Sequence, residues 1–197
     1  LVRSDNPELQ SPKSTSADLT YDEVEALVRK AIELAGGLDD KIESGDMVLI
    51  KPNIVDPDPS GSGEITDVRV VKALIKIIDE IAPGKIELVV GEGSPRPMDY
   101  EMKYQSKFGS PQWEKLWDEA GYQSLKTDSD LPDVDLRLSN LNGSPPEDPW
   151  QDLRKVELGS ECQALPQNGQ YVIHKDVLNT DFYISVPVLK IHSVGMT

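Results

Sequence analysis

Three apolar segments of this chain each end in a short polar cluster, the third after the intervening residues 187–189 (Pro-Val-Leu). The segments are residues 47–50, 86–90 and 182–186, and lysine, asparagine, glycine, glutamate, serine or histidine follows each of them. The pattern predicts neighbouring parallel strands, and the continuously apolar run at residues 47–50 is typical of a strand covered on both faces. The carboxyl ends of neighbouring parallel strands lie at one edge of the sheet, and open α/β sheets bind ligands at that edge. The pattern therefore predicts both a fold class and the place of a binding site.

Two amphipathic helices are predicted around the first of these strands. Thr20 and Glu23 have the spacing of a capping box, and apolar residues then recur at helical spacing up to two glycines at residues 36–37. Thr66 is a suitable N-cap for the second helix, which residues 83–84 (Pro-Gly) end. Strand, helix and strand in this order are typical of a right-handed βαβ unit.

We expect one α/β domain over residues 1–197, with a mostly parallel sheet, flanking helices and a less regular excursion in the second half. We also expect the domain to be truncated at its C-terminus. Long loops or excursions are predicted at residues 95–110 and 139–152, a packed helix with Trp113 and Trp117 between them, and three short strands further on. The short strands are expected at residues 134–138, 153–158 and 171–173, with a helical turn at residues 176–179.

The charge balance limits the classes of partner. The chain has 35 acidic and 20 basic residues, a net charge of −15, so we expect neither nucleic acid nor anionic lipid to bind it. No apolar run reaches the ~20 residues of a membrane helix, so no membrane span is predicted. A local basic pocket remains compatible with this charge, because Lys51, Arg96 and Lys190 need only act within one cleft. The acidic surface favours a periplasmic or extracellular location over a cytoplasmic one.

The first polar cluster contains Lys51 and Asn53 at the end of a buried strand. A lysine there neutralises a phosphate or carboxylate, or forms an imine if burial lowers its pKa, and the asparagine amide donates and accepts around a polar ligand. The alternative is that Lys51 extends to water and Asn53 caps a turn. Pro52 restricts the backbone of Lys51 to an extended conformation, which directs the lysine side chain.

The second cluster is Gly91, Glu92, Gly93 and Ser94. Glycines allow close approach of the backbone to a ligand and present N–H groups to an anion, Ser94 adds a hydroxyl, and Glu92 is a candidate general base or metal ligand. The cluster matches neither the dinucleotide fingerprint nor the Walker loop. The alternative is an ordinary tight turn.

The third cluster places Lys190 and His192 on one side of an extended segment. The lysine charge lowers the pKa of a neighbouring histidine and keeps it neutral for base work or metal binding. The alternative is a structural histidine, which is also the role that we assign to His174. A carboxylate and one imidazole are too few ligands for a catalytic zinc site, so no metal site is predicted. The acidic residues Asp128, Asp130, Asp133 and Asp135 fit a solvated loop better than a calcium site.

Together these pieces resemble the family called domain of unknown function 362 (DUF362). The resemblance spans most of the chain and rests on residues 48–53, Thr66 with its following helix, residues 90–94 and residues 181–197. It implies an α/β fold and a site made from the strand-end residues, and it implies no particular reaction. Some relatives carry ferredoxin-like cysteine clusters, and many are exported with twin-arginine signals. The single cysteine, Cys162, cannot hold an iron–sulfur cluster in this chain alone.

Two functional hypotheses follow. In the first, the chain is an enzyme, or the ligand-binding part of one, that binds a small anionic ligand: Lys51 and Lys190 supply charge, Asn53 and residues 91–94 bind, and Glu92 and His192 transfer protons. In the second, it is a non-catalytic exported binding or assembly protein whose long loops contact a protein partner. Convergence of Lys51, Glu92 and Lys190 in one pocket favours the first hypothesis.

Overall fold

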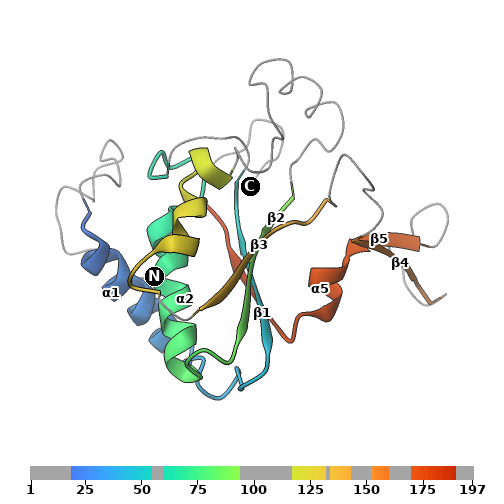
Figure 1. Ribbon diagram of the computed structural model, residues 1–197, viewed down its shortest axis with the longest axis horizontal. Coiled ribbons are helices and arrows are strands. Elements are labelled where there is room, and N and C mark those ends of the chain that lie inside the picture. The colour runs from blue at the N-terminus through green and yellow to red at the C-terminus, as the bar shows by residue number, and fades with distance from the viewer. Residues whose placement is uncertain are drawn as a thin grey trace.

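The protein is built around a four-stranded sheet of parallel strands (Figure 1). The computed structural model describes residues 19–54, 60–93, 117–131, 134–142, 152–159 and 170–189. The strand order is β3-β2-β1-β6, and each of the three pairings is parallel. The strands are β1 (Met47–Pro52), β2 (Glu87–Glu92), β3 (Asp135–Asn140) and β6 (Phe182–Val186). The three apolar segments are thus neighbours, as predicted, with β1 between the other two.

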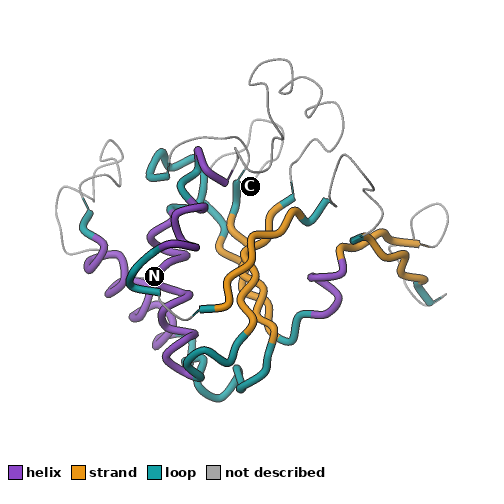
Figure 2. Tube along the Cα trace, in the orientation of Figure 1, coloured by secondary structure: helices purple, strands orange, loops and turns teal. Residues whose placement is uncertain are grey.

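Two helices cover one face of the sheet (Figure 2). Helix α1 (Tyr21–Leu34) begins with the predicted capping box, in which Thr20 and Glu23 satisfy each other's backbone N–H groups. Helix α2 (Val68–Ile81) follows β1 and has the expected apolar stripe. Its N-cap is Asp67, whose carboxylate accepts from the Arg69 N–H, so the prediction that Thr66 caps this helix is wrong. Thr66 instead bonds to the ends of two strands.

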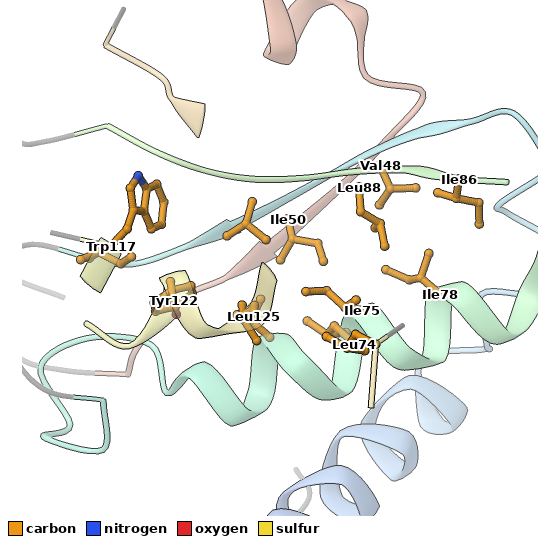
Figure 3. Packing of buried hydrophobic residues seen from close by; sticks show 14 of the residues in the cluster. Val48, Ile50, Leu74, Ile75, Ile78, Ile86, Leu88, Trp117, Tyr122 and Leu125 are labelled. Atoms are coloured by element: carbon orange, nitrogen blue, oxygen red, sulfur yellow. The ribbon is translucent and has the colours of Figure 1, made fainter. Parts of the chain in front are cut away.

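The main hydrophobic core lies between the sheet and α2 (Figure 3). Alternate residues of the strands face this helix, and Val48, Ile50, Leu88 and Val90 are almost completely buried there. The burial of each such side chain contributes about 1.5–3 kcal/mol. The 3-10 helix η3 (Tyr122–Thr127) closes the end of this core nearest the carboxyl ends of the strands, where further members of the cluster are Trp117, Tyr122 and Leu125.

The opposite face of the sheet carries a small antiparallel unit (Figure 1). It consists of β4 (Leu153–Glu157), β5 (Gln170–His174) and the short helix α5 (Lys175–Asn179), as the sequence predicts to within two residues at each end. His174 is buried, and its Nδ1 accepts a hydrogen bond from the Asp176 N–H at 3.2 Å. The structural role predicted for His174 is confirmed, because the imidazole caps α5.

Some predicted features lie outside the described residues. They include the loop at residues 95–110, Trp113, and most of the excursion at residues 139–152. Strand β3 continues to Asn140, two residues into that predicted excursion. Trp117 lies within the described residues and is buried. The centroid of its ring is 5.7 Å from that of the Tyr122 ring. Among the described helices, none has the length and apolarity that a membrane crossing requires.

Candidate functional site

Lys51 and Glu92 meet at the carboxyl ends of β1 and β2. The Lys51 ammonium donates to both Glu92 oxygens, at 2.9 Å to Oε1 and 2.8 Å to Oε2. The two side chains differ in exposure: 35% of the lysine side chain is accessible and only 7% of the glutamate side chain. The carboxylate therefore lies beneath the ammonium, and solvent reaches the lysine first.

Backbone donors from two loops complete the hydrogen bonds of the Glu92 carboxylate. The Gly93 N–H donates to Oε1 at 2.8 Å, and the buried Ile54 N–H donates to Oε2 at 3.2 Å. A buried carboxylate requires such partners, because burial of an uncompensated charge is costly. Glu92 therefore ties the end of β2 to the segment that follows β1. The Gly93 N–H, which the sequence offers to an anionic ligand, is engaged by Glu92.

Asn53 is held through both its backbone and its side chain. Its N–H donates to the Thr66 hydroxyl at 2.9 Å, its carbonyl accepts from the Thr66 N–H at 2.9 Å, and its Nδ2 donates to the Glu64 carbonyl at 3.2 Å. The loop that leaves β1 thus returns to lie against its own start. This arrangement fixes Asn53 two residues from Lys51, partly exposed at the same edge.

Close packing explains why glycine occupies positions 91 and 93. A Cβ atom on Gly91 would lie 2.9 Å from Leu49 Cδ1 and 3.0 Å from Leu141 Cδ2, and one on Gly93 would lie 2.7 Å from Asn142 Oδ1. These distances are shorter than van der Waals contact permits. The absence of a side chain at these two positions therefore allows Leu49, Leu141 and Asn142 to pack directly against the backbone at the end of β2.

The structure thus brings together five of the predicted residues, which we call the strand-end site: Lys51, Asn53, Gly91, Glu92 and Gly93. Ser94, Lys190 and His192 lie outside the described residues, so their assignment stays a prediction. The last described residues before Lys190 follow β6, which pairs with β1 in a register that places Ser185 opposite Lys51.

Sequence reasoning missed the polar residues at the end of β3. Asn140 pairs in register with Glu92, and Asn142 lies against Gly93. The Asn140 Oδ1 accepts from the Asn142 N–H at 3.0 Å, while its buried Nδ2 has no hydrogen-bond partner within the described part of the chain. The sequence does carry a signal for them, because Ser139, Asn140 and Asn142 follow the predicted strand at residues 134–138 directly.

The acidic run contains no cation site in the residues that the structure describes. Asp128 and Asp130 both pair with the Lys72 ammonium, at 2.7 and 2.8 Å. Lys72 thereby fixes the turn after η3 against α2. Within the described ranges no group of three or more histidine, cysteine, aspartate or glutamate residues could hold a metal ion.

A separate group of polar residues, which we call the buried polar cluster, lies near the end of β3. It consists of Ser139, His174 and Asp176, which are 6%, 4% and 2% exposed. The residue types match a catalytic triad, but the geometry does not. The Ser139 hydroxyl donates to Asp176 Oδ2 at 2.5 Å rather than to the histidine, and Arg137 donates to the same oxygen at 2.6 Å. The cluster therefore docks α5 on the sheet.

The ionisation states in the buried polar cluster follow from the burial of its side chains and from their hydrogen-bond partners. Burial opposes ionisation of Asp176, but the hydrogen bonds from Arg137 and Ser139 outweigh it and hold the pKa of the carboxyl below its usual range. Burial lowers the pKa of His174, more than the nearby Asp176 raises it. The native state therefore holds an ionised aspartate beside a neutral histidine.

The fold and the strand-end site define a class: an α/β protein whose parallel strands carry polar residues to one sheet edge. Within that class, the chain belongs to the DUF362 family, a domain of unknown function, which it matches over residues 48–197. The matched region contains all five residues of the strand-end site. No curated protein and no solved structure shows significant similarity to the chain.

Proposed function

We propose that the strand-end site binds a small anionic ligand, such as a phosphate or a carboxylate compound, through the Lys51 ammonium. One observation carries the proposal: Lys51 is anchored from below by the buried Glu92 and remains accessible from above. A carboxylate that fixes an ammonium at the mouth of a site lowers the entropic cost of placing it against a ligand. The carboxyl edge of a parallel sheet is also the usual ligand site of such folds.

The neighbouring groups favour recognition of oxygen atoms. The Asn53 side chain lies at the same edge, and the buried Asn140 Nδ2 is a donor without a partner in the described structure. The N-terminus of α2 does not contribute, because Asp67 already caps it. Since Glu92 balances the charge of Lys51, the described part of the site is close to neutral. We therefore expect modest affinity from Lys51 alone, to which Lys190 adds if it reaches the same ligand.

A catalytic role follows from the same pair if the ligand is a substrate. A proton on Lys51 Nζ lies within hydrogen-bond distance of both Glu92 oxygens, so the pair is suited to transfer a proton between the ligand and a buried carboxylate. In this proposal Glu92 serves as the acid–base group and His192 assists it. A ligand proton competes with three donor groups, which already make four hydrogen bonds to the carboxylate.

Thermal unfolding in phosphate tests the binding proposal. Melting temperatures are measured in sodium phosphate and in sodium chloride at equal ionic strength, so that general screening of the −15 charge cancels. A ligand at ten times its Kd adds about 1.4 kcal/mol to the free energy of unfolding. The test variant is Lys51→Met/Glu92→Gln, which removes both charges together. The matched control is Lys85→Met, which removes an exposed lysine two residues before the N-terminal end of β2.

We expect phosphate to stabilise the wild type and Lys85→Met beyond the effect of chloride, and not to stabilise the double variant. Equal phosphate effects in all three proteins would show that the anion acts elsewhere, and the proposal would fail. A panel of small carboxylates run in the same way identifies the preferred anion.

The second hypothesis, an exported binding or assembly protein whose loops contact a protein partner, depends on the predicted loops at residues 95–110 and 139–152. Residues 95–110 and 143–151 of these loops lie outside the described structure, so this hypothesis stays a prediction. It is distinguished from the first by the same experiment, because a loop-mediated contact does not depend on Lys51.

A further inference from the structure

The structure assigns Thr66 as a positioning residue that couples the end of β6 to the strand-end site through its hydroxyl group. This inference rests on the proposed function for its link to ligand binding, while the coupling itself rests on geometry alone. Thr66 is 4% exposed and lies before α2, away from direct contact with solvent. It is not one of the residues that the sequence assigned to the site.

Four hydrogen bonds converge on Thr66. Its hydroxyl donates to the Val186 carbonyl at 2.6 Å and accepts from the Asn53 N–H at 2.9 Å. Its N–H donates to the Asn53 carbonyl at 2.9 Å, and its carbonyl accepts from the Tyr122 hydroxyl at 2.7 Å. One residue thus joins the segment after β1, the last residue of β6 and the 3-10 helix η3.

The hydroxyl makes the two bonds that connect strands. Asn53 and Val186 lie at the ends of neighbouring strands, where the parallel ladder of β1 and β6 stops at the pair Pro52 and Val186. A threonine hydroxyl can donate one hydrogen bond and accept another, so it links the two strands one residue beyond the last pair of the ladder. Tyr122, which is buried at that end of the core (Figure 3), holds the threonine backbone through the hydrogen bond from its hydroxyl to the Thr66 carbonyl.

The consequence for the site is a fixed geometry at its rim. Lys51 lies in β1 and Asn53 directly follows this strand. Along the chain, Lys190 comes four residues after Val186, the last residue of β6. Loss of the hydroxyl removes both bonds that link Asn53 to Val186 beyond the end of the β1–β6 ladder. It leaves the Lys51–Glu92 pair intact, because neither residue bonds to Thr66.

Thr66→Val tests the coupling, because valine has the shape of threonine without the hydroxyl. Thr66→Ser keeps the hydroxyl and serves as the rescue variant. The matched control is Thr180→Val: the Thr180 hydroxyl also links β1 to the β6 segment, by accepting from the Leu49 N–H and donating to the Met47 carbonyl, but at the opposite end of the sheet. Amide hydrogen exchange and phosphate affinity are measured for each variant under conditions in which it is folded.

We expect Thr66→Val to lower the exchange protection of the Asn53 amide about tenfold and to weaken phosphate binding about fivefold, the effect of one lost hydrogen bond. Thr66→Ser should restore both, and Thr180→Val should change neither. Unchanged Asn53 exchange in Thr66→Val, or an equal loss of phosphate affinity in Thr180→Val, would overturn the inference. If phosphate fails to bind the wild type, the proposed function fails, and exchange at Asn53 alone decides the coupling.

Discussion

At the scale of single residues, the unequal burial of Lys51 and Glu92 has the clearest energetic consequence. The glutamate has exchanged water for four hydrogen bonds, two of them from one ammonium. The lysine, at 35% exposure, keeps part of its hydration. Removal of the lysine therefore leaves a buried charge, whereas removal of the glutamate charge leaves an ammonium that can turn to water.

We predict that Lys51→Met lowers the free energy of unfolding by about 1–3 kcal/mol, and that Glu92→Gln lowers it by less. The double variant should be more stable than the sum of the two single effects implies, because the second change removes the group that the first left unpaired. Urea unfolding of the four proteins measures this coupling. Additive effects would show that the two side chains do not interact in solution.

The pair His174 and Asp176 predicts how stability depends on pH. Both groups have a pKa below its ordinary value in the native state, so the unfolded chain binds more protons and stability falls as pH falls. The histidine contribution begins to be lost as pH falls below about 6.5, its ordinary pKa, and the aspartate contribution is lost at lower pH, as the carboxyl is protonated in the native state.

His174→Asn tests the histidine contribution, because asparagine is a good N-cap but does not titrate. We expect the loss of stability between pH 7 and pH 5 to be smaller in this variant than in the wild type, when measured by urea unfolding at each pH. An unchanged pH dependence would mean that His174 does not resist protonation in the native state.

At the scale of elements, the packing of β2 depends on the absence of a side chain at Gly91. The strand end lies against Leu49 and Leu141, which leave no room for a Cβ atom. Gly91→Ala should therefore cost about 1–3 kcal/mol through overpacking, despite the higher strand propensity of alanine. The matched substitution Gly36→Ala has open space but requires a positive φ of 99°, so its cost is one of backbone strain. Thermal unfolding compares the two, and a neutral Gly91→Ala would contradict the packing described here.

Helix α1 gives a second test at this scale. Its capping box joins Thr20 and Glu23 through reciprocal hydrogen bonds. Thr20→Ala should lower the free energy of unfolding by about 1 kcal/mol, a change that circular dichroism during urea unfolding detects. A change within measurement error would show that the box frays in solution.

The elements were predictable where pattern and local chemistry agree. The capping box of α1, the apolar stripe of α2 and the strands β1, β2 and β6 followed from residue spacing alone, although β6 alternates between partly buried and exposed residues where β1 and β2 are largely buried. The N-cap of α2 did not, since Thr66 and Asp67 are both good caps and only the tertiary bonds of Thr66 decide between them. The location of the site was predictable, because the carboxyl ends of neighbouring parallel strands lie at one edge of the sheet. The direct bond between Lys51 and Glu92 was not, because it depends on the order of the strands and on the direction of the two side chains.

At the scale of the whole molecule, the fold gathers polar residues at one sheet edge in a chain whose net charge is −15. Such a charge destabilises the compact state through repulsion, which salt screens. We predict that sodium chloride up to about 0.2 M raises the melting temperature of the wild type and of Lys51→Met alike. A salt effect confined to the wild type would indicate instead that chloride binds at Lys51.

The central proposal is that a small anion binds at the strand-end site. The direct measurement is a titration of the isotope-labelled protein with phosphate, followed through backbone amide chemical shifts, with sodium chloride at equal ionic strength as the reference. We predict saturable shifts concentrated at Asn53, residues 91–93 and Asn140, which Lys51→Met/Glu92→Gln abolishes. Shifts that spread over the surface without saturation, or that persist in that variant, would contradict it.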